Sequence, residues 1–151
     1  MRINMSYPHS QGRVGKIFVF ALLAGAASSC SRATRPPLYP VQGTVTVQMK
    51  PASKAVVVLR PVSSGPLNSL LPHGEVGPDG VFRIGTYTDS DGAPAGDYIV
   101  TITWPASRTD PKTGDVISED LLMGKYNNPA KSQWTITIQP GHNELVPFRL
   151  D

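Results

Sequence analysis

Alternation of apolar and polar side chains with a period of two is the feature that most restricts how this chain can fold. In residues 41–48 the odd positions hold valine or glycine, whereas all four even positions are polar. Residues 98–104 and 134–138 repeat the alternation with larger apolar side chains. Successive side chains of a strand point to opposite faces, so these runs predict half-buried β-strands.

Turn-forming residues separate the alternating runs. The chain has 15 Pro and 14 Gly, and residues 77–80 place Pro78, Asp79 and Gly80 in the order that a tight turn favours. Residues 134–138 and 144–150 are expected to form a hairpin around a turn at 140–143. Pro147 lacks a donor for the sheet ladder, so its strand is expected at an edge or to bulge there.

Six or seven short strands without a strong helix predict an all-β fold, an antiparallel seven-stranded β-sandwich over residues 41–151. Residues 105–128 have no clear alternation and are interpreted as a long polar loop. A body of this size buries enough surface for one hydrophobic core without disulfides.

The first 29 residues are typical of a signal peptide. Arg2, Arg13 and Lys16 precede an apolar run at 17–27, and small residues follow it. Eleven residues of helix span about 16 Å, roughly half of the bilayer core, so a stable membrane span is not expected. A charged start, a short apolar stretch and small residues before a cleavage site define a secretory signal.

Cys30 is the only cysteine of the chain and directly follows these small residues. Its position resembles the bacterial lipobox, whose cysteine is lipidated and becomes the first mature residue, although Ala27 stands where the usual pattern prefers Leu. The alternative is an ordinary cysteine near a conventional cleavage site. Residues 30–40, rich in proline, are predicted to be an extended tether.

The positive charge of the chain belongs to its start. The formal net charge is +3, yet from Cys30 onward 11 basic residues balance 11 acidic ones. Nucleic acids are held mainly through neutralisation of their phosphates. A neutral domain without a Lys/Arg cluster therefore predicts no nucleic-acid partner.

Four segments in order resemble one known family. They are residues 41–45, 55–59, 77–84 and 94–102, which give an opening Gly-Xaa-Val strand, an apolar strand, an Asp-Gly turn before Phe82, and Pro-Ala-Gly-Xaa-Tyr before an alternating strand. This outline resembles the carboxypeptidase regulatory-like, transthyretin-like (prealbumin-type) domain.

Residues 124–150 are further similar to small lipoproteins of planctomycete-type bacteria that carry this domain. The resemblance implies a seven-stranded sandwich that serves as an accessory, surface or adhesion module without catalytic residues. It covers residues 41–104, so the loops at 86–92 and 105–128 are where a particular function is expected.

The densest cluster of polar residues is at 88–92, where Asp89 and Asp91 precede Gly92. Two carboxylates and a turn suit Ca²⁺, but a full EF-hand loop needs further ligands and a closing Glu. An ordinary solvated turn and a calcium site with Asp89 and Asp91 as ligands both remain open.

No catalytic or cofactor motif is present. His73 and His142 lie in separate turn-rich segments without the convergent ligands that zinc needs. The acids of the long loop, Asp110, Asp115, Glu119 and Asp120, are interpreted as solubilising charge. We expect no enzyme activity, no cofactor and no metal.

Two functional hypotheses follow. The first is a non-catalytic envelope lipoprotein, anchored by lipid on Cys30 to the cell membrane or outer membrane, with its domain facing the periplasm or the exterior. It would bind a protein or polysaccharide partner or have a structural role. The second is a small-ligand or calcium-binding protein that uses loops 86–92 and 105–128. A polar pocket among Trp104, Tyr126 and the long loop would favour the second.

Overall fold

The structure is a computed structural model that describes residues 35–63, 65 and 69–151. The predicted signal peptide and Cys30 lie outside these residues. The described part is almost entirely β, which confirms the all-β prediction. Its elements are β1 Leu38–Tyr39, β2 Val41–Val47, β3 Lys50–Pro51, β4 Val56–Pro61, β5 His73–Glu75, β6 Val81–Arg83, β7 Ala93–Pro94, β8 Gly96–Thr103, β9 Pro105–Thr109, β10 Val116–Asp120, the 3₁₀ turn η2 Pro129–Lys131, β11 Thr135–Ile138, β12 Asn143–Glu144 and β13 Phe148–Leu150.

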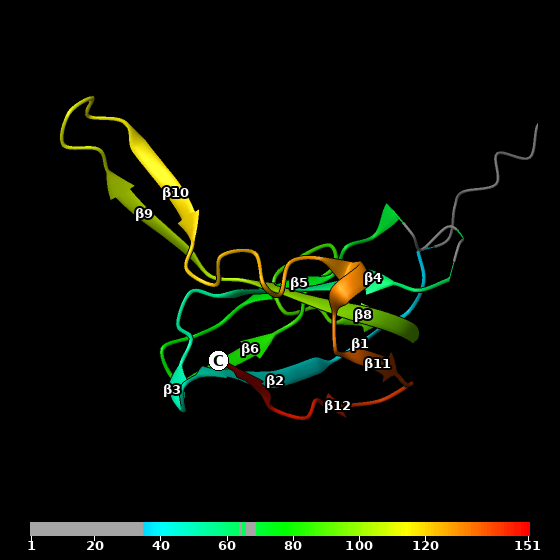
Figure 1. Cartoon of the computed structure of the whole chain (residues 1–151). Coiled ribbons are helices and arrows are strands. Elements are labelled where there is room, and N and C mark those ends of the chain that lie inside the picture. Colours follow the sequence, from blue (N-terminus) through cyan, green and yellow to red (C-terminus); the bar gives the residue numbers. More distant parts are fainter. Residues whose placement is uncertain (1–34, 64, 66–68) are drawn as a thin grey trace, which may run out of the picture. The chain divides into compact units, whose positions relative to one another are not determined.

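The first sheet has the order β11-β8-β4-β5, and all of its pairs are antiparallel (Figure 1). Its longest pairing joins β4 to β8, with Val57 opposite Ile102 and Leu59 opposite Val100. These four side chains are fully or almost fully buried. The β-branched and aliphatic runs predicted from the sequence therefore form the centre of this sheet.

The second sheet is built around β2. On one side β2 pairs with β3 and β6 in antiparallel fashion, and on the other with β12 and β13 in parallel. Val41 and Val45 point into the core and alternate with half-buried polar residues, as the period of two predicts. The parallel pairs depart from the purely antiparallel sandwich that was expected.

The two sheets pack their apolar faces into one core, which confirms a sandwich. Tyr98 is the largest fully buried side chain of this core, with 1% exposure, and its hydroxyl donates a hydrogen bond to the carbonyl of Pro94 at 2.9 Å. Burial raises the pKa of Tyr98 above its ordinary value. The ring thus packs inward while the hydroxyl bonds to the backbone of β7.

The predicted C-terminal hairpin is wrong. β11 pairs with β8 in the first sheet, whereas β12 and β13 pair with β2 in the second. The turn at 140–143 therefore carries the chain from one layer to the other, because the edge of the second sheet beside β2 is free to accept it. The expectation for Pro147 is confirmed, since the strand stops at Glu144 and resumes at Phe148.

Two predicted boundaries also change. Residues 105–128 are not simply a loop, because β9 and β10 form a two-stranded antiparallel sheet with five residue pairs. The predicted tether ends earlier than Pro40, because Leu38 and Tyr39 pair with Pro94 and Ala93.

Within the described part of the chain, no helix has the length and apolarity needed to cross a membrane.

Candidate functional site

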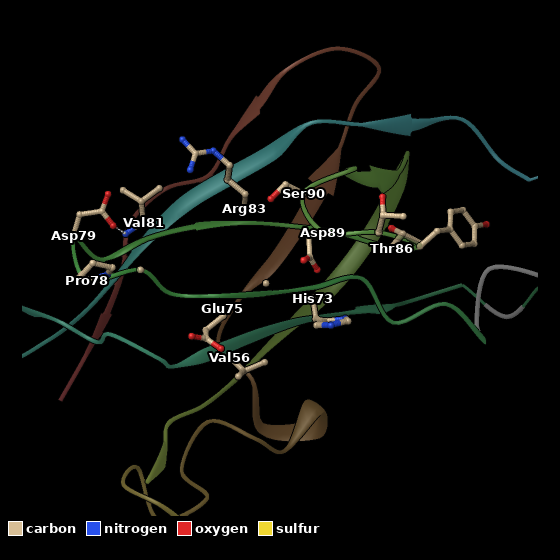
Figure 2. Close-up of a pocket in the computed structure, with 15 residues that line it drawn as sticks. Val56, His73, Glu75, Pro78, Asp79, Val81, Arg83, Thr86, Asp89 and Ser90 are labelled. Carbon is tan, nitrogen blue, oxygen red and sulfur yellow. Dashed lines mark hydrogen bonds between the residues drawn. The ribbon is translucent and has the colours of Figure 1, made fainter. Parts of the chain in front are cut away.

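A polar groove of about 800 Å³ lies along β5 and β6 and is bordered by the loop that follows them (Figure 2). We call it the polar groove. Its lining residues are Val56, His73, Gly74, Glu75, Gly77, Pro78, Asp79, Val81, Arg83, Gly85, Thr86, Tyr87, Thr88, Asp89 and Ser90. Loop 86–92, which the sequence marked as a place for function, supplies one side of this groove.

A bent hairpin from His73 to Gly85 forms the floor of the groove. It joins the two sheets, because β5 pairs with β4 and β6 pairs with β2. His73 and Gly85 exchange backbone hydrogen bonds of 2.9 and 2.8 Å. At Gly74 a Cβ would overlap the carbonyl oxygen of Arg83, so the strands approach too closely for any other residue.

The tip of this hairpin is the turn that the sequence predicts at 77–80. The amide of Gly80 donates to the carbonyl of Gly77 at 3.0 Å, and Gly80 has a φ of +85°. Asp79 Oδ1 accepts a 3.0 Å hydrogen bond from the amide of Val81 (Figure 2). A residue with positive φ here strongly favours glycine, and the Asp side chain completes the turn.

Loop 86–92 is ordered by the carboxylate of Asp91. Its Oδ1 accepts from the amide of Thr86 at 2.6 Å, and its Oδ2 accepts from the amides of Tyr87 and Thr88 at 3.1 and 3.0 Å. Burial would raise the pKa of Asp91, but these hydrogen bonds to its charged form together hold the pKa below 3.8. The loop is therefore built on one ionised carboxylate.

This geometry does not favour the predicted calcium site. Three of the roughly four acceptor positions of the Asp91 carboxylate are filled by amide donors, which would also repel a cation placed among them. Asp89 is exposed and lines the groove without joining Asp91 in a ligand set. Across residues 35–63, 65 and 69–151, no three His, Cys, Asp or Glu side chains gather as metal ligands.

The groove offers both charge and an aromatic surface. Glu75, Asp79 and Asp89 contribute three carboxylates, and Arg83 contributes one guanidinium. The lining is thus acidic on balance when His73 is neutral. Tyr87 keeps 37% of its surface exposed, and the guanidinium carbon of Arg35 lies 4.6 Å from its ring centroid.

A second groove, about 340 Å³, lies between β11 and the segment 144–148, and we call it the apolar groove. Its lining includes Trp134, Ile136, Leu145, Val146 and Phe148. Trp134 packs against Phe148 with ring centroids 5.2 Å apart. This groove marks the side of the sandwich where the two sheets are not joined by a hairpin.

Other candidates from the sequence do not assemble into a site. Trp104 is half-buried and donates from Nε1 to the carbonyl of Ser53 at 2.9 Å. Tyr126 is buried against Trp134, at a centroid distance of 5.5 Å. Neither residue lines either groove, so the polar pocket expected around them is replaced by one on β5 and β6.

The remaining titratable candidates are dispersed. Glu119 pairs with Arg108 at 2.9 Å on exposed surface, and His142 lies 3.7 Å from Glu144. Asp120 instead orders a turn, because its carboxylate accepts from the amides of Trp104, Leu122 and Gly124. The groove residues Glu75 and Arg83 were not singled out from the sequence. The one signal for them in the sequence is their position on either side of the predicted turn at 77–80.

Comparison with known proteins adds little to this geometry. No protein-family model and no curated protein matches the chain. The chain is similar to a protein from Pseudomonas aeruginosa described as a proposed carbohydrate-binding protein, with 11% identity and a TM-score of 0.42 over 77% of this chain and 90% of that one. A 9R-lipoxygenase from Cyanothece PCC8801 is 14% identical, with a TM-score of 0.40. The match covers 78% of this chain and 17% of the enzyme. A DUF3823 family protein from Parabacteroides merdae ATCC 43184 is 18% identical, with a TM-score of 0.37. The match covers 74% of this chain and 45% of that one. Likenesses this distant carry no weight for function.

The role of Asp91 predicts a specific pH response. A depressed pKa means that the carboxylate stabilises the folded loop above pH 3.8 and that this contribution is lost as the pH falls through the lower folded-state pKa. In an NMR titration, the amide shifts of Thr86, Tyr87 and Thr88 should move together with a midpoint below 3.8. Asp91→Asn should abolish that transition, whereas Asp115→Asn should leave it intact. A midpoint above 3.8 would contradict the assigned hydrogen bonds.

Proposed function

We propose that the protein is a non-catalytic binding protein of the cell envelope and that the polar groove holds a neutral oligosaccharide or polysaccharide. The observation that carries the proposal is the groove lining, which combines carboxylates, a guanidinium and hydroxyls with an exposed aromatic ring. An open groove of about 800 Å³ has room for several sugar units.

Sugar chemistry fits this lining. Each sugar hydroxyl both donates and accepts hydrogen bonds, so it needs acceptors such as Asp89 and Glu75 and donors such as Arg83. The apolar C–H face of a sugar ring packs on an aromatic face, and Tyr87, which lines the groove and is 37% exposed, can supply the ring face that Arg35 does not cover. The excess of carboxylates disfavours polyanions, so a neutral glycan fits this lining better than an acidic one.

The exposure of the groove supports binding without catalysis. Catalytic carboxylates and histidines have their pKa values tuned by burial and by close neighbours, and closed sites exclude water. Here the side chains of His73, Glu75, Asp79 and Asp89 are all exposed. The groove therefore offers hydrogen bonds to a ligand but no environment that would activate a general acid or base.

The proposal extends to family and location. The segments that resemble a carboxypeptidase regulatory-like domain lie on β2, β4, the hairpin β5–β6 and β8, the strands that support the groove. We propose that lipid on Cys30 ties this domain to the cell membrane or the outer membrane. Several acyl chains give firm anchoring, since each buried methylene contributes about 0.8 kcal/mol.

Substitutions in the groove test the binding proposal. Tyr87→Ala and Asp89→Asn should each weaken the binding of neutral oligosaccharides about tenfold, since each removes a contact worth about 1 kcal/mol or more. Binding is measured by calorimetry with the neutral oligosaccharide that gives the strongest signal on a glycan array. Met123→Ala and Asp115→Asn change exposed residues outside the groove and should leave affinity unchanged.

Two results would contradict the binding proposal. One is an array on which acidic glycans bind and neutral ones do not. The other is binding that Tyr87→Ala and Asp89→Asn weaken no more than the two control variants do.

The anchoring proposal has its own test. Cys30→Ala should abolish incorporation of radiolabelled palmitate and release the protein from the membrane fraction of cells. Cys30→Ser is the matched variant, because it keeps the size of the side chain and removes only the thiol. A wild-type chain that incorporates no palmitate would refute lipidation without touching the binding proposal.

A further inference from the structure

The outer edge of β11 is an unprotected strand edge. Within the described part of the chain, β11 pairs with β8 alone. The residues from Gln133 to Gln139 include no charge and no proline, which are two of the devices that protect an edge. By contrast, the facing segment 144–148 carries Pro147, which has no amide to donate.

The ladder with β8 fixes which backbone groups face outward. The amide of Val100 donates to the carbonyl of Trp134 at 3.0 Å, so the backbone carbonyl of Trp134 points toward β8. Hydrogen bonding alternates along an antiparallel pair, so Ile136 and Ile138 also bond toward β8. The amides and carbonyls of Thr135 and Thr137 therefore point away from the sheet, toward the free edge.

The apolar groove adjoins this edge on the inner face of the sheet. Ile136 and Trp134 lie on that face and line the groove, together with Val146, which is 81% exposed. A strand added beside β11 would place one side chain over the groove and its two neighbours on the outer face. The groove thus requires an uncharged strand with an apolar residue between two small polar ones.

β11 itself meets this requirement, with Ile136 between Thr135 and Thr137. We propose that β11 pairs in antiparallel fashion with β11 of a second copy of the chain. Thr135 of each copy lies opposite Thr137 of the other, and the two Ile136 residues face each other at the two-fold axis. This register satisfies the outward amides and carbonyls of both threonines in both copies.

Side-chain chemistry agrees with the register. The two isoleucines form a non-hydrogen-bonded pair, in which side chains are closest, and they cover the apolar grooves of both copies. Thr–Thr pairs on the outer face are favourable cross-strand neighbours. No like charges are brought together, because the strand is uncharged. The dimer continues the first sheet of each copy across the contact and leaves both polar grooves open.

Paired charge variants test this register. Thr135→Lys with Thr137→Lys places lysine opposite lysine at both threonine pairs, whereas Thr135→Glu with Thr137→Lys places glutamate opposite lysine. The two double variants differ only in the sign of the charge at position 135. Thr109→Lys with Thr113→Lys adds the same charge to exposed positions of β9 and the turn after it, and serves as the control.

Sedimentation equilibrium of the full chain in detergent gives the readout, with circular dichroism to verify folding. Because the contact is small, we expect wild-type dimers with a dissociation constant of about 100 µM. The Lys/Lys variant should dimerise at least about tenfold more weakly, and the Glu/Lys variant and the control should dimerise like wild type. The proposal would be overturned if the wild-type chain stayed monomeric at all concentrations. Binding of a foreign peptide at β11 by such a monomer would not rescue it. Equal dimerisation of the two β11 double variants would overturn it as well.

Discussion

The close approach of two backbone segments at Gly74 is the constraint on which the site depends. Because residue 74 has no side chain, the carbonyl of Arg83 can occupy that space, and β5 and β6 lie against each other although they belong to different sheets. This contact joins one side of the sandwich and brings loop 86–92 beside the hairpin. Asp91 then holds the loop through three amides. The polar groove is the product of these two local arrangements.

The opposite side of the sandwich has a different character. Within residues 35–63, 65 and 69–151 no hairpin joins the sheets there, because the turn at 140–143 passes from β11 to β12 without pairing them. The gap is lined by Trp134, Ile136 and Phe148, and among the residues that the structure describes β11 pairs with β8 alone. One side of the fold therefore presents polar groups in a groove, and the other presents apolar surface and a strand edge.

The sequence predicted local structure well and long-range pairing poorly. Alternation located β2, β8 and β11, and turn chemistry located the turn at 77–80, since both depend on neighbouring residues. The parallel pairing of β13 with β2 depends on which edge is vacant in the folded molecule, and no local pattern encodes it. The same limit hid the groove, because Glu75 and Asp89 line it together only through the close approach of β5 and β6 at Gly74.

Residue-resolved amide hydrogen exchange at low protein concentration tests most directly whether one side of the sandwich is closed and the other open. The amides of His73 and Gly85, which cross the closed side, should be protected, as should that of Ile136, which bonds toward β8. The amides of Thr135 and Thr137 should exchange fast. Rapid exchange at His73 and Gly85, or protection of Thr135 and Thr137 equal to that of Ile136, would contradict this account.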